Sequence, residues 1–195
     1  APTRLIDVSC LSPRIVASPE DGHHYLTLSY CWGTGHVEPD PSDSRASSSG
    51  SIPLRAAKYN ADGTSDAETI VTTTRATFKS RCNGIAMSRL PKTLQDAISI
   101  TRRLDIKYLW VDSLCIIQDS VEDWAYEASR IGDYYAKSYL TLSALDSGDA
   151  RSGMLLQRQN QSSVHIEGNL LLRPAVRTWG EVFRTAPLSD RAWAL

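Results

Sequence analysis

The stretch YLWVDSLCIIQD (residues 108–119) contains two apolar runs, each of which ends at polar side chains. The first run combines aromatic and β-branched residues, which is typical of a strand inside a sheet. Asp112 and Ser113 follow that run, and Gln118 and Asp119 follow the second. We therefore predict a buried strand whose end is marked by an acid and a hydroxyl group.

Strands and helices alternate on both sides of this stretch. Before it, Pro91 suits the first turn of a helix in which apolar residues recur at helical spacing. After it, Asp119 or Ser120 can cap a second helix with acidic residues in its first turn. The predicted strands are residues 24–31, 107–112 and 139–144, and the predicted helices are residues 91–104 and 121–137. This order, with near-continuous apolar strands, predicts an α/β fold with a mainly parallel sheet flanked by helices.

Residues 34–89 interrupt this alternation, and we interpret them as an irregular insertion after the first strand. Residues 40–66 are rich in Ser, Pro and Gly. They should be the least ordered part of the chain, because they bury too little surface to offset the entropy of ordering. The β-branched run at residues 68–78 is expected to add a hairpin arm inside the insertion.

The C-terminal part of the chain is less regular. A Glu-Gly-Asn turn signal at residues 167–169 lies between two alternating runs and predicts a C-terminal β-hairpin. Ser189 or Asp190 can cap a further helix, which would break off at Leu195 within its second turn. We therefore expect a truncated end, with the helix continuing beyond this residue.

The composition is that of one globular domain, which we assign to residues 1–195. Of the 195 residues, 42% are hydrophobic and 22% are charged, and the formal net charge is −1. This balance offers no basic surface for nucleic acid or for an anionic membrane. No apolar run approaches the ~18 residues of a membrane span, and the N-terminus lacks the pattern of an export signal. We therefore expect a soluble, cytoplasmic protein.

The four cysteines are spread along the chain without the spacing of a zinc site. They are Cys10, Cys31, Cys82 and Cys115. In an apolar context a free thiol behaves as a small hydrophobic group, so we expect free thiols in a reducing compartment and no bound metal. A nucleophilic Cys115 is a weaker hypothesis, because its apolar neighbours should raise its pKa.

The ends of the predicted parallel strands form the candidate site. Ligands bind beyond the carboxyl ends of such strands, where loops carry polar groups on a rigid platform. The groups at these ends are Ser29, Tyr30, Trp32 and Gly33 after the first strand, and Asp112 and Ser113 after the second. The alternative stays equally open: Asp112 caps a turn, and residues 114–117 fill the core.

Three blocks of the sequence resemble the signature blocks of the fungal heterokaryon-incompatibility (HET) domain in order and wording. They include YLTLSYCWG, LPKTLQDAISITRRLDIKYLWVDSLCIIQD and DRAWAL, and the resemblance covers residues 25–33, 90–154 and 187–195. It implies an effector of allorecognition and regulated cell death, joined to other domains of a larger receptor-like protein. HET domains have been likened to TIR domains, some of which cleave NAD. The resemblance therefore also implies a flavodoxin-like or TIR-like sheet, with NAD as a substrate rather than a cofactor.

On this comparison two acids are the candidate catalytic residues, Asp112 at the end of its strand and Glu127 within the second helix. Loss of nicotinamide from NAD passes through an oxocarbenium-like state, which a carboxylate stabilises without a metal or cofactor. The candidate substrate-binding residues are Ser29, Tyr30, Trp32, Gly33, Ser113, Cys115, Gln118, Asp119, Trp124, Arg191 and Trp193. HET sequences commonly continue the last block with Gln-Glu, so a further acid is expected beyond Leu195.

Several of these candidates have a structural alternative. Glu127 can form an ion pair with Arg130 on a solvated helix face. Gln118 and Asp119 divide between capping their loop and contacting a substrate, and buried tryptophans are more often core residues than stacking platforms. The opposing functional hypothesis is a non-enzymatic signalling module that acts by self-association or by recruiting partners. The fold alone does not decide between the two functions.

Overall fold

The computed structural model describes residues 1–19, 22–32, 71–155, 164–166, 170–172 and 178–190. Three predictions fall outside these ranges: the low order of residues 40–66, the placement of Gly33, Arg191 and Trp193, and the course of the helix after Asp190. They stay predictions.

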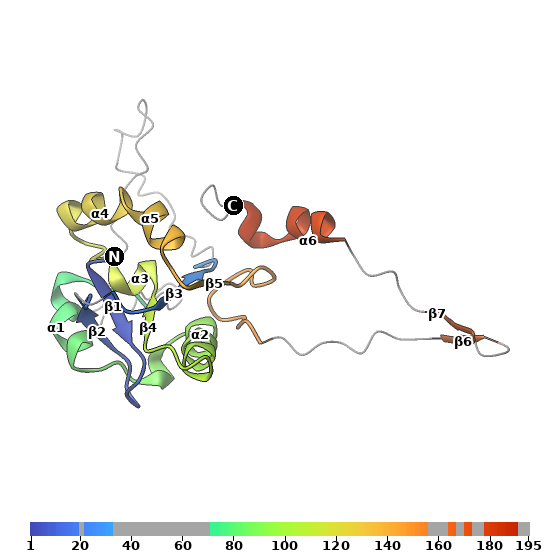
Figure 1. Ribbon diagram of the computed structural model, residues 1–195, viewed down its shortest axis with the longest axis horizontal. Coiled ribbons are helices and arrows are strands. Elements are labelled where there is room, and N and C mark those ends of the chain that lie inside the picture. The colour runs from blue at the N-terminus through green and yellow to red at the C-terminus, as the bar shows by residue number, and fades with distance from the viewer. Residues whose placement is uncertain (20–21, 33–70, 156–163, 167–169, 173–177, 191–195) are drawn as a thin grey trace, which may run out of the picture.

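A five-stranded sheet forms the centre of the fold, with the strand order β2-β1-β4-β3-β5 (Figure 1). The strands are β1 Arg4–Asp7, β2 Arg14–Ala17, β3 Tyr25–Ser29, β4 Tyr108–Trp110 and β5 Leu140–Ser143. β3 lies between β4 and β5 and is parallel to both. The prediction that the three strands of residues 24–31, 107–112 and 139–144 are parallel neighbours is confirmed.

Two N-terminal strands make the sheet mixed rather than mainly parallel. β1 pairs antiparallel with both β2 and β4. Neither strand was predicted, because RLID and RIVA each carry a charged residue and lack the longer apolar and aromatic run that marks β3 and β4. Tertiary packing defines β1 instead, since Leu5 and Ile6 are each 1% exposed in the core. The prediction of a mainly parallel sheet therefore holds only for its other half.

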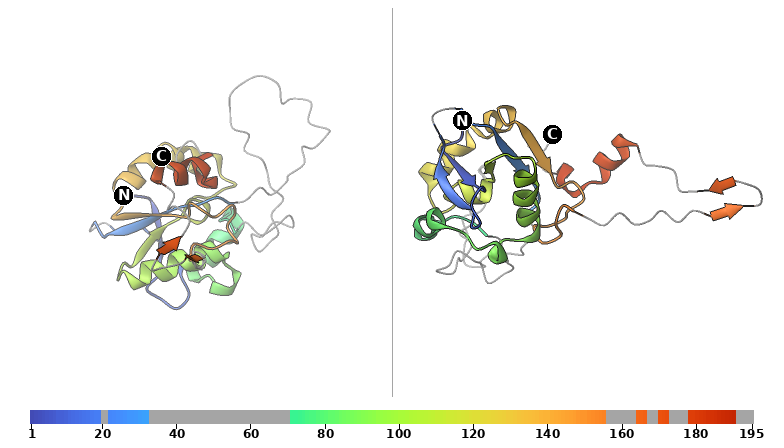
Figure 2. Two further views of the ribbon diagram at one scale, coloured as in Figure 1. Left: turned by 90° about the vertical axis from the view of Figure 1, so that its right-hand side faces the viewer. Right: turned by 60° about the horizontal axis from the view of Figure 1, so that its bottom comes forward.

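Helices cover both faces of the sheet, as predicted (Figures 1 and 2). α2, Lys92–Arg103, precedes β4 and lies on one face. α4, Val121–Ala128, and α5, Ile131–Ala136, connect β4 with β5 and lie on the opposite face. A single turn of helix, α3 Asp112–Cys115, follows β4 almost at once.

The sequence pattern of α2 explains how it packs. Its buried residues recur at helical spacing, and Leu94, Ala97 and Ile98 are each no more than 1% exposed. Pro91 stands just before the first turn, where its missing N–H costs no hydrogen bond. The predicted helix of residues 91–104 is confirmed.

The predicted helix of residues 121–137 is wrong in one respect, because it is two helices with a break at Ser129 and Arg130. The side chains of both residues bind the carbonyl oxygen of Tyr126: Ser129 Oγ donates at 2.8 Å and Arg130 Nη1 at 3.1 Å. They occupy the acceptor that the backbone of a continuous helix would use. The break therefore follows from side-chain contacts that helical periodicity does not report.

The end of the predicted insertion, residues 34–89, contains regular structure. It forms α1, Arg75–Asn83, and a short 3-10 helix, η1, Met87–Arg89. Between them, Ile85 is 5% exposed and donates its N–H to the Pro13 carbonyl at 2.7 Å. This part of the chain therefore belongs to the core, and reading it as irregular was wrong.

The hairpin arm predicted at residues 68–78 is also wrong for the described part of that run. Thr73 forms an isolated parallel bridge with Ile117. α1 then begins after Thr74, whose side chain accepts the Thr77 N–H in a capping box. The β-branched run does contain an extended segment, but its threonines cap a helix instead of turning the chain back.

The C-terminal part contains the predicted hairpin and one helix that the sequence analysis missed. β6, Val164–Ile166, pairs antiparallel with β7, Leu170–Leu172, on either side of the predicted turn. α6, Trp179–Thr185, begins with a Thr-x-x-Glu capping box. A short 3-10 helix, η2, Pro187–Asp190, follows at the place where a longer helix was predicted to begin.

Trp110 at the end of β4 fills the core between the sheet and α5. It is 0% exposed, and its ring meets those of Tyr134 and Tyr135 edge-on at centroid distances of 5.5 and 5.7 Å. The Tyr135 hydroxyl in turn donates to the Leu28 carbonyl on β3 at 3.1 Å. Because Asp112 follows two residues after Trp110, this packing fixes the strand end at which the candidate site begins.

Candidate functional site

The carboxyl ends of β3 and β4 lie side by side and bring the first group of predicted site residues together. The two strands are parallel, with Thr27 opposite Trp110. β3 continues into Tyr30 and Trp32, and β4 continues through Val111 into α3. Side chains from segments 80 residues apart in the sequence therefore meet at this edge of the sheet.

Asp112 is held at this edge by two donors on one carboxylate oxygen. Trp32 Nε1 donates to Oδ1 at 3.1 Å, and the Ser113 backbone N–H donates to the same atom at 2.7 Å. Asp112 is the first residue of α3, and its carboxylate accepts an N–H of that first turn, so it has the local structural contact that the alternative expected, although Val111 is the cap position. The residue is partly exposed, so it also faces solvent beyond the strand end.

Tyr30 and Ser113 meet in the interior next to Asp112. The Tyr30 hydroxyl and Ser113 Oγ are 2.8 Å apart, and the two residues are 4% and 0% exposed. Ser29 is 8% exposed, and its carbonyl accepts the Ala144 N–H at 2.9 Å. All three residues lie at the predicted edge. Because all three are buried, they stabilise the strand ends and do not face solvent.

Gln118 and Asp119 both stabilise the loop that follows α3. Gln118 Nε2 donates to the carbonyl oxygens of Asp112 and Ile116 at 3.0 and 3.2 Å. Asp119 Oδ1 accepts the Arg75 backbone N–H at 2.8 Å and so holds the start of α1. The sequence left open whether these residues cap the loop or contact a substrate. The contacts observed are those of loop capping.

The segment before α1 borders the site, which the sequence analysis missed. Thr73 donates its N–H to the Ser113 carbonyl at 2.9 Å and its hydroxyl to the Leu114 carbonyl at 2.7 Å. In return, the Gln118 N–H donates to the Thr73 carbonyl at 2.8 Å. The run VTTT at residues 71–74 indicated an extended segment, but it did not indicate which part of the chain this segment pairs with.

Glu127 lies in a partly buried polar group that we call the Arg4 cluster, formed by Thr3, Arg4, Asp123, Glu127 and Tyr134. Arg4 Nη2 is 2.5 Å from Asp123 Oδ2 and 3.6 Å from Glu127 Oε1. Glu127 also accepts hydrogen bonds from the hydroxyl of Thr3 and, at 2.8 Å, from that of Tyr134. At 1% exposure, Glu127 does not form the solvated pair with Arg130 that the alternative interpretation expected.

The Arg4 cluster is joined to α3 and to the loop after it. Arg4 Nε donates to the Cys115 carbonyl at 2.6 Å, and Asp123 Oδ2 accepts the Ile117 N–H at 2.8 Å. Glu127 therefore points back toward the end of β4, but its carboxylate is enclosed. Trp124, one turn earlier in the same helix, is partly buried and packs against the core. Nothing in the sequence around Arg4 indicated these partners.

Cys115 lies near both candidate acids, and its thiol is buried. Burial is the main reason that its pKa rises from 9.0 to about 12. A hydrogen bond with the Val111 backbone and the charge of Arg4 oppose this rise in pKa, whereas the carboxylates of Glu127 and Asp112 add to it. The predicted rise is confirmed, and the thiol stays protonated at neutral pH. At 1% exposure it offers a substrate no surface in this conformation.

Three candidates, Gly33, Arg191 and Trp193, lie outside the described residues. The predicted cleft between the strand ends and the C-terminal segment therefore stays a prediction. Among the residues that the structure describes, no three His, Cys, Asp or Glu side chains are grouped as a metal site requires. None of the helices in those ranges is both long and apolar enough to cross a membrane.

A family model described as heterokaryon incompatibility protein (HET) matches residues 25–195. The chain belongs to the HET family. The HET match begins at the first residue of β3 and includes Trp32 and Asp112, whereas β1 and β2 precede it. Arg4, which binds Glu127, therefore lies outside the part of the chain that matches the HET model. No curated protein and no solved structure matches the chain.

Proposed function

We propose that this HET domain is a cell-death effector that cleaves NAD at the bond between ribose and nicotinamide. Membership of the HET family indicates a role in heterokaryon incompatibility. The main structural support for NAD cleavage is the position of the Asp112 carboxylate, to which Trp32 donates a hydrogen bond at the carboxyl end of β4. The proposal places the domain in the fungal cytoplasm, as one part of a larger receptor-like protein.

The order of the three parallel strands supports a TIR-like arrangement. The chain passes from β3 to β4 on one side and then crosses to β5 on the other. In sheets of this flavodoxin-like order the winding reverses between the first and third of these strands, here β3 and β5, and ligands bind beyond the carboxyl ends next to that point. Trp32 and Asp112 follow the carboxyl ends of β3 and β4. β1 and β2 are additions to such a sheet.

The reaction requires a negative charge next to the ribose. The bond between C1′ and the nicotinamide nitrogen breaks, and its electron pair leaves with nicotinamide, which becomes neutral. The ribose acquires oxocarbenium character, which a nearby carboxylate stabilises. Water then adds to C1′ and releases a proton, for which the Asp112 carboxylate is the acceptor. The products are ADP-ribose and nicotinamide, and no electrons are exchanged with another molecule.

Trp32 and Glu127 have different roles in this proposal. Trp32 is partly exposed, and its hydrogen bond to Asp112 fixes the ring, so its face can stack on nicotinamide or adenine. Glu127 is the second candidate acid. To reach a substrate its carboxylate must leave Thr3 and Tyr134, so we rank it below Asp112.

A non-enzymatic signalling module is the second candidate function, and β5 favours it. β5 is at one edge of the five-stranded sheet, and no described strand pairs with its outer side. Tyr139 and Leu140 are 65% and 47% exposed there. An exposed edge strand is a template for pairing with a second copy of the chain or with a partner.

Expression of the chain and its variants in fungal cells separates the two functions, with cell death and the NAD pool as readouts. Asp112→Asn keeps an acceptor for Trp32 and removes the charge, so we expect loss of killing and an unchanged NAD pool. Leu140→Lys puts a charge on the open edge, so killing and NAD loss should persist if chemistry is the cause. The opposite pair of results would replace the enzyme with the signalling module.

A further inference from the structure

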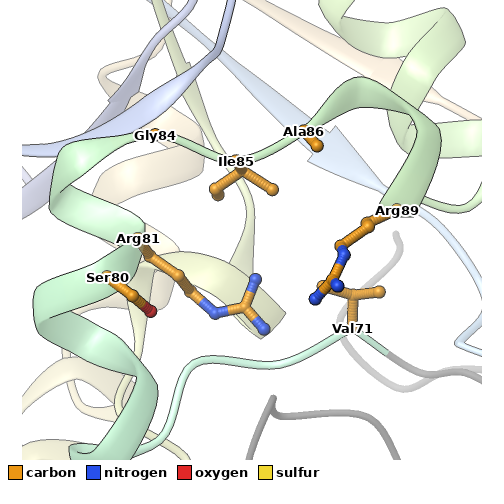
Figure 3. A pocket seen from close by; sticks show the side chains of 7 residues that line it. All are labelled: Val71, Ser80, Arg81, Gly84, Ile85, Ala86 and Arg89. Carbon is orange, nitrogen blue, oxygen red and sulfur yellow. The ribbon is translucent and has the colours of Figure 1, made fainter.

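We propose that a pocket between α1 and η1 binds a small molecule through its phosphate group. The pocket has a volume of about 280 Å³, and its lining includes the side chains of Arg81 and Arg89 (Figure 3). None of the residues that Figure 3 labels is acidic, and two of them are arginines. The pocket shares no residue with Trp32 and Asp112, and the inference is therefore independent of the proposed function.

The two guanidinium groups enter the pocket from different sides and point toward one another (Figure 3). Arg81 belongs to the last turn of α1 and is 6% exposed, whereas Arg89 ends η1 and is exposed. Arg81 Nε lies 3.4 Å from Thr77 Oγ1, one turn earlier in α1, and this contact helps to orient the guanidinium. Guanidinium groups that approach from two sides offer an anion charged donors in more than one direction.

Both arginines also have other interactions within the chain. An incoming anion must therefore compete with them, and we expect moderate rather than tight binding. The competition also makes the pocket selective, because a single weak negative charge gains less from the two guanidinium groups than a doubly charged phosphate does.

A phosphate suits this arrangement better than a carboxylate does. A carboxylate is planar, and one guanidinium satisfies it through two parallel hydrogen bonds, whereas a phosphate presents oxygens in several directions. The Ser80 hydroxyl already donates to the Thr77 carbonyl at 2.8 Å, so the side-chain donors for a phosphate come from the two arginines. Val71 and Ile85, 4% and 5% exposed, form an apolar wall that suits the uncharged part of a phosphorylated metabolite.

Calorimetric titration of the full chain with pyrophosphate, at constant ionic strength, tests the proposal. We expect saturable binding by the wild type and binding about tenfold weaker in Arg89→Gln, which removes one charged donor group. Arg103→Gln is the matched control, because Arg103 is exposed at the end of α2 and outside the pocket. It should bind pyrophosphate as the wild type does. Urea unfolding of each variant shows that lost binding is not lost folding.

Four results would each overturn the proposal. They are no saturable binding to the folded wild type, equal affinity in Arg89→Gln, an equal loss in Arg103→Gln, and succinate binding as tightly as pyrophosphate. The third result would mean that overall charge, and not this pocket, attracts the anion. The last result would mean that the pocket binds carboxylates as well as phosphates.

Discussion

Asp112 is both a structural contact in the first turn of α3 and the first candidate for chemistry. Its Oδ1 atom accepts hydrogen bonds from Trp32 and from the Ser113 N–H. Asp112→Ala should therefore lower the free energy of unfolding by about 1 kcal/mol, the usual net contribution of an intramolecular hydrogen bond. Asp112→Asn keeps an acceptor and should lower it less. Urea denaturation measures both, and equal losses would show that the negative charge, not the acceptor, holds α3.

Glu127 gives a second prediction at the scale of residues. Glu127→Ala removes a buried partner of Arg4 and should lower the free energy of unfolding by about 3 kcal/mol. Glu122→Ala is the control in the same helix, since that side chain is 80% exposed and pairs with Arg75 at the surface. It should leave the urea midpoint almost unchanged. Similar losses in the two variants would contradict a structural Arg4 cluster.

Cys115 gives a pH-dependent prediction. Its pKa rises from 9.0 to about 12 on folding, mainly through burial, so the unfolded chain loses this proton at lower pH than the folded chain. The thiol's contribution to stability is full below the unfolded value and is lost as the pH rises toward the folded one. Above pH 9 the wild type should therefore lose stability relative to Cys115→Ala, by up to about 1.4 kcal/mol per pH unit. A stability difference that does not change with pH would count against this burial.

The elements that the sequence predicted are those with a local pattern. α2 shows helical spacing over 12 residues, and β3 has five buried residues in succession, so both were predicted. β1 and β2 each carry a charged residue and lack a longer apolar run, and the break between α4 and α5 depends on side chains that bind the Tyr126 carbonyl. In these cases tertiary contacts or side-chain hydrogen bonds, which leave no periodic trace, decide the structure.

At the scale of elements, the loop after β5 is attached to the start of α2. Asp96 Oδ2 accepts the N–H groups of Met154 and Leu155 at 2.9 and 3.3 Å. Thr93 Oγ1 accepts the Gly153 N–H at 3.1 Å. Gly153 has a φ of +78°, and a Cβ on it would lie 2.8 Å from Asp96 Oδ2. The attachment therefore depends on a glycine at this position.

Gly153→Ala should lower the free energy of unfolding by about 1–2 kcal/mol from backbone strain alone, and displacement of Asp96 adds to that loss. Gly148→Ala is the control in the same loop, because a Cβ there would meet no atom within 4 Å. It should change the thermal midpoint little. Equal thermal midpoints for the two variants would contradict the attachment of this loop to α2.

At the scale of the whole molecule, the alternation of strands and helices was enough to predict where the candidate site lies. It placed the ends of β3 and β4 at one edge, and Trp32 and Asp112 do meet there. It could not predict Arg4 or Thr73, because neither follows the end of a predicted strand and both pair with the site only in the folded chain. Only the three-dimensional arrangement shows that one candidate acid is partly exposed and the other enclosed.

Release of nicotinamide from NAD by the purified chain tests the proposed chemistry most directly. We expect the wild type to convert NAD to ADP-ribose and nicotinamide, and Asp112→Asn to do so at least about 100-fold more slowly while remaining folded. Asp105→Asn is the control: its φ of 58° suits Asn, the residue is exposed, and it should retain the wild-type rate. An unchanged rate in Asp112→Asn, or no cleavage of NAD by the folded wild type, would contradict the assignment of Asp112 as the catalytic carboxylate of a NAD-cleaving HET domain.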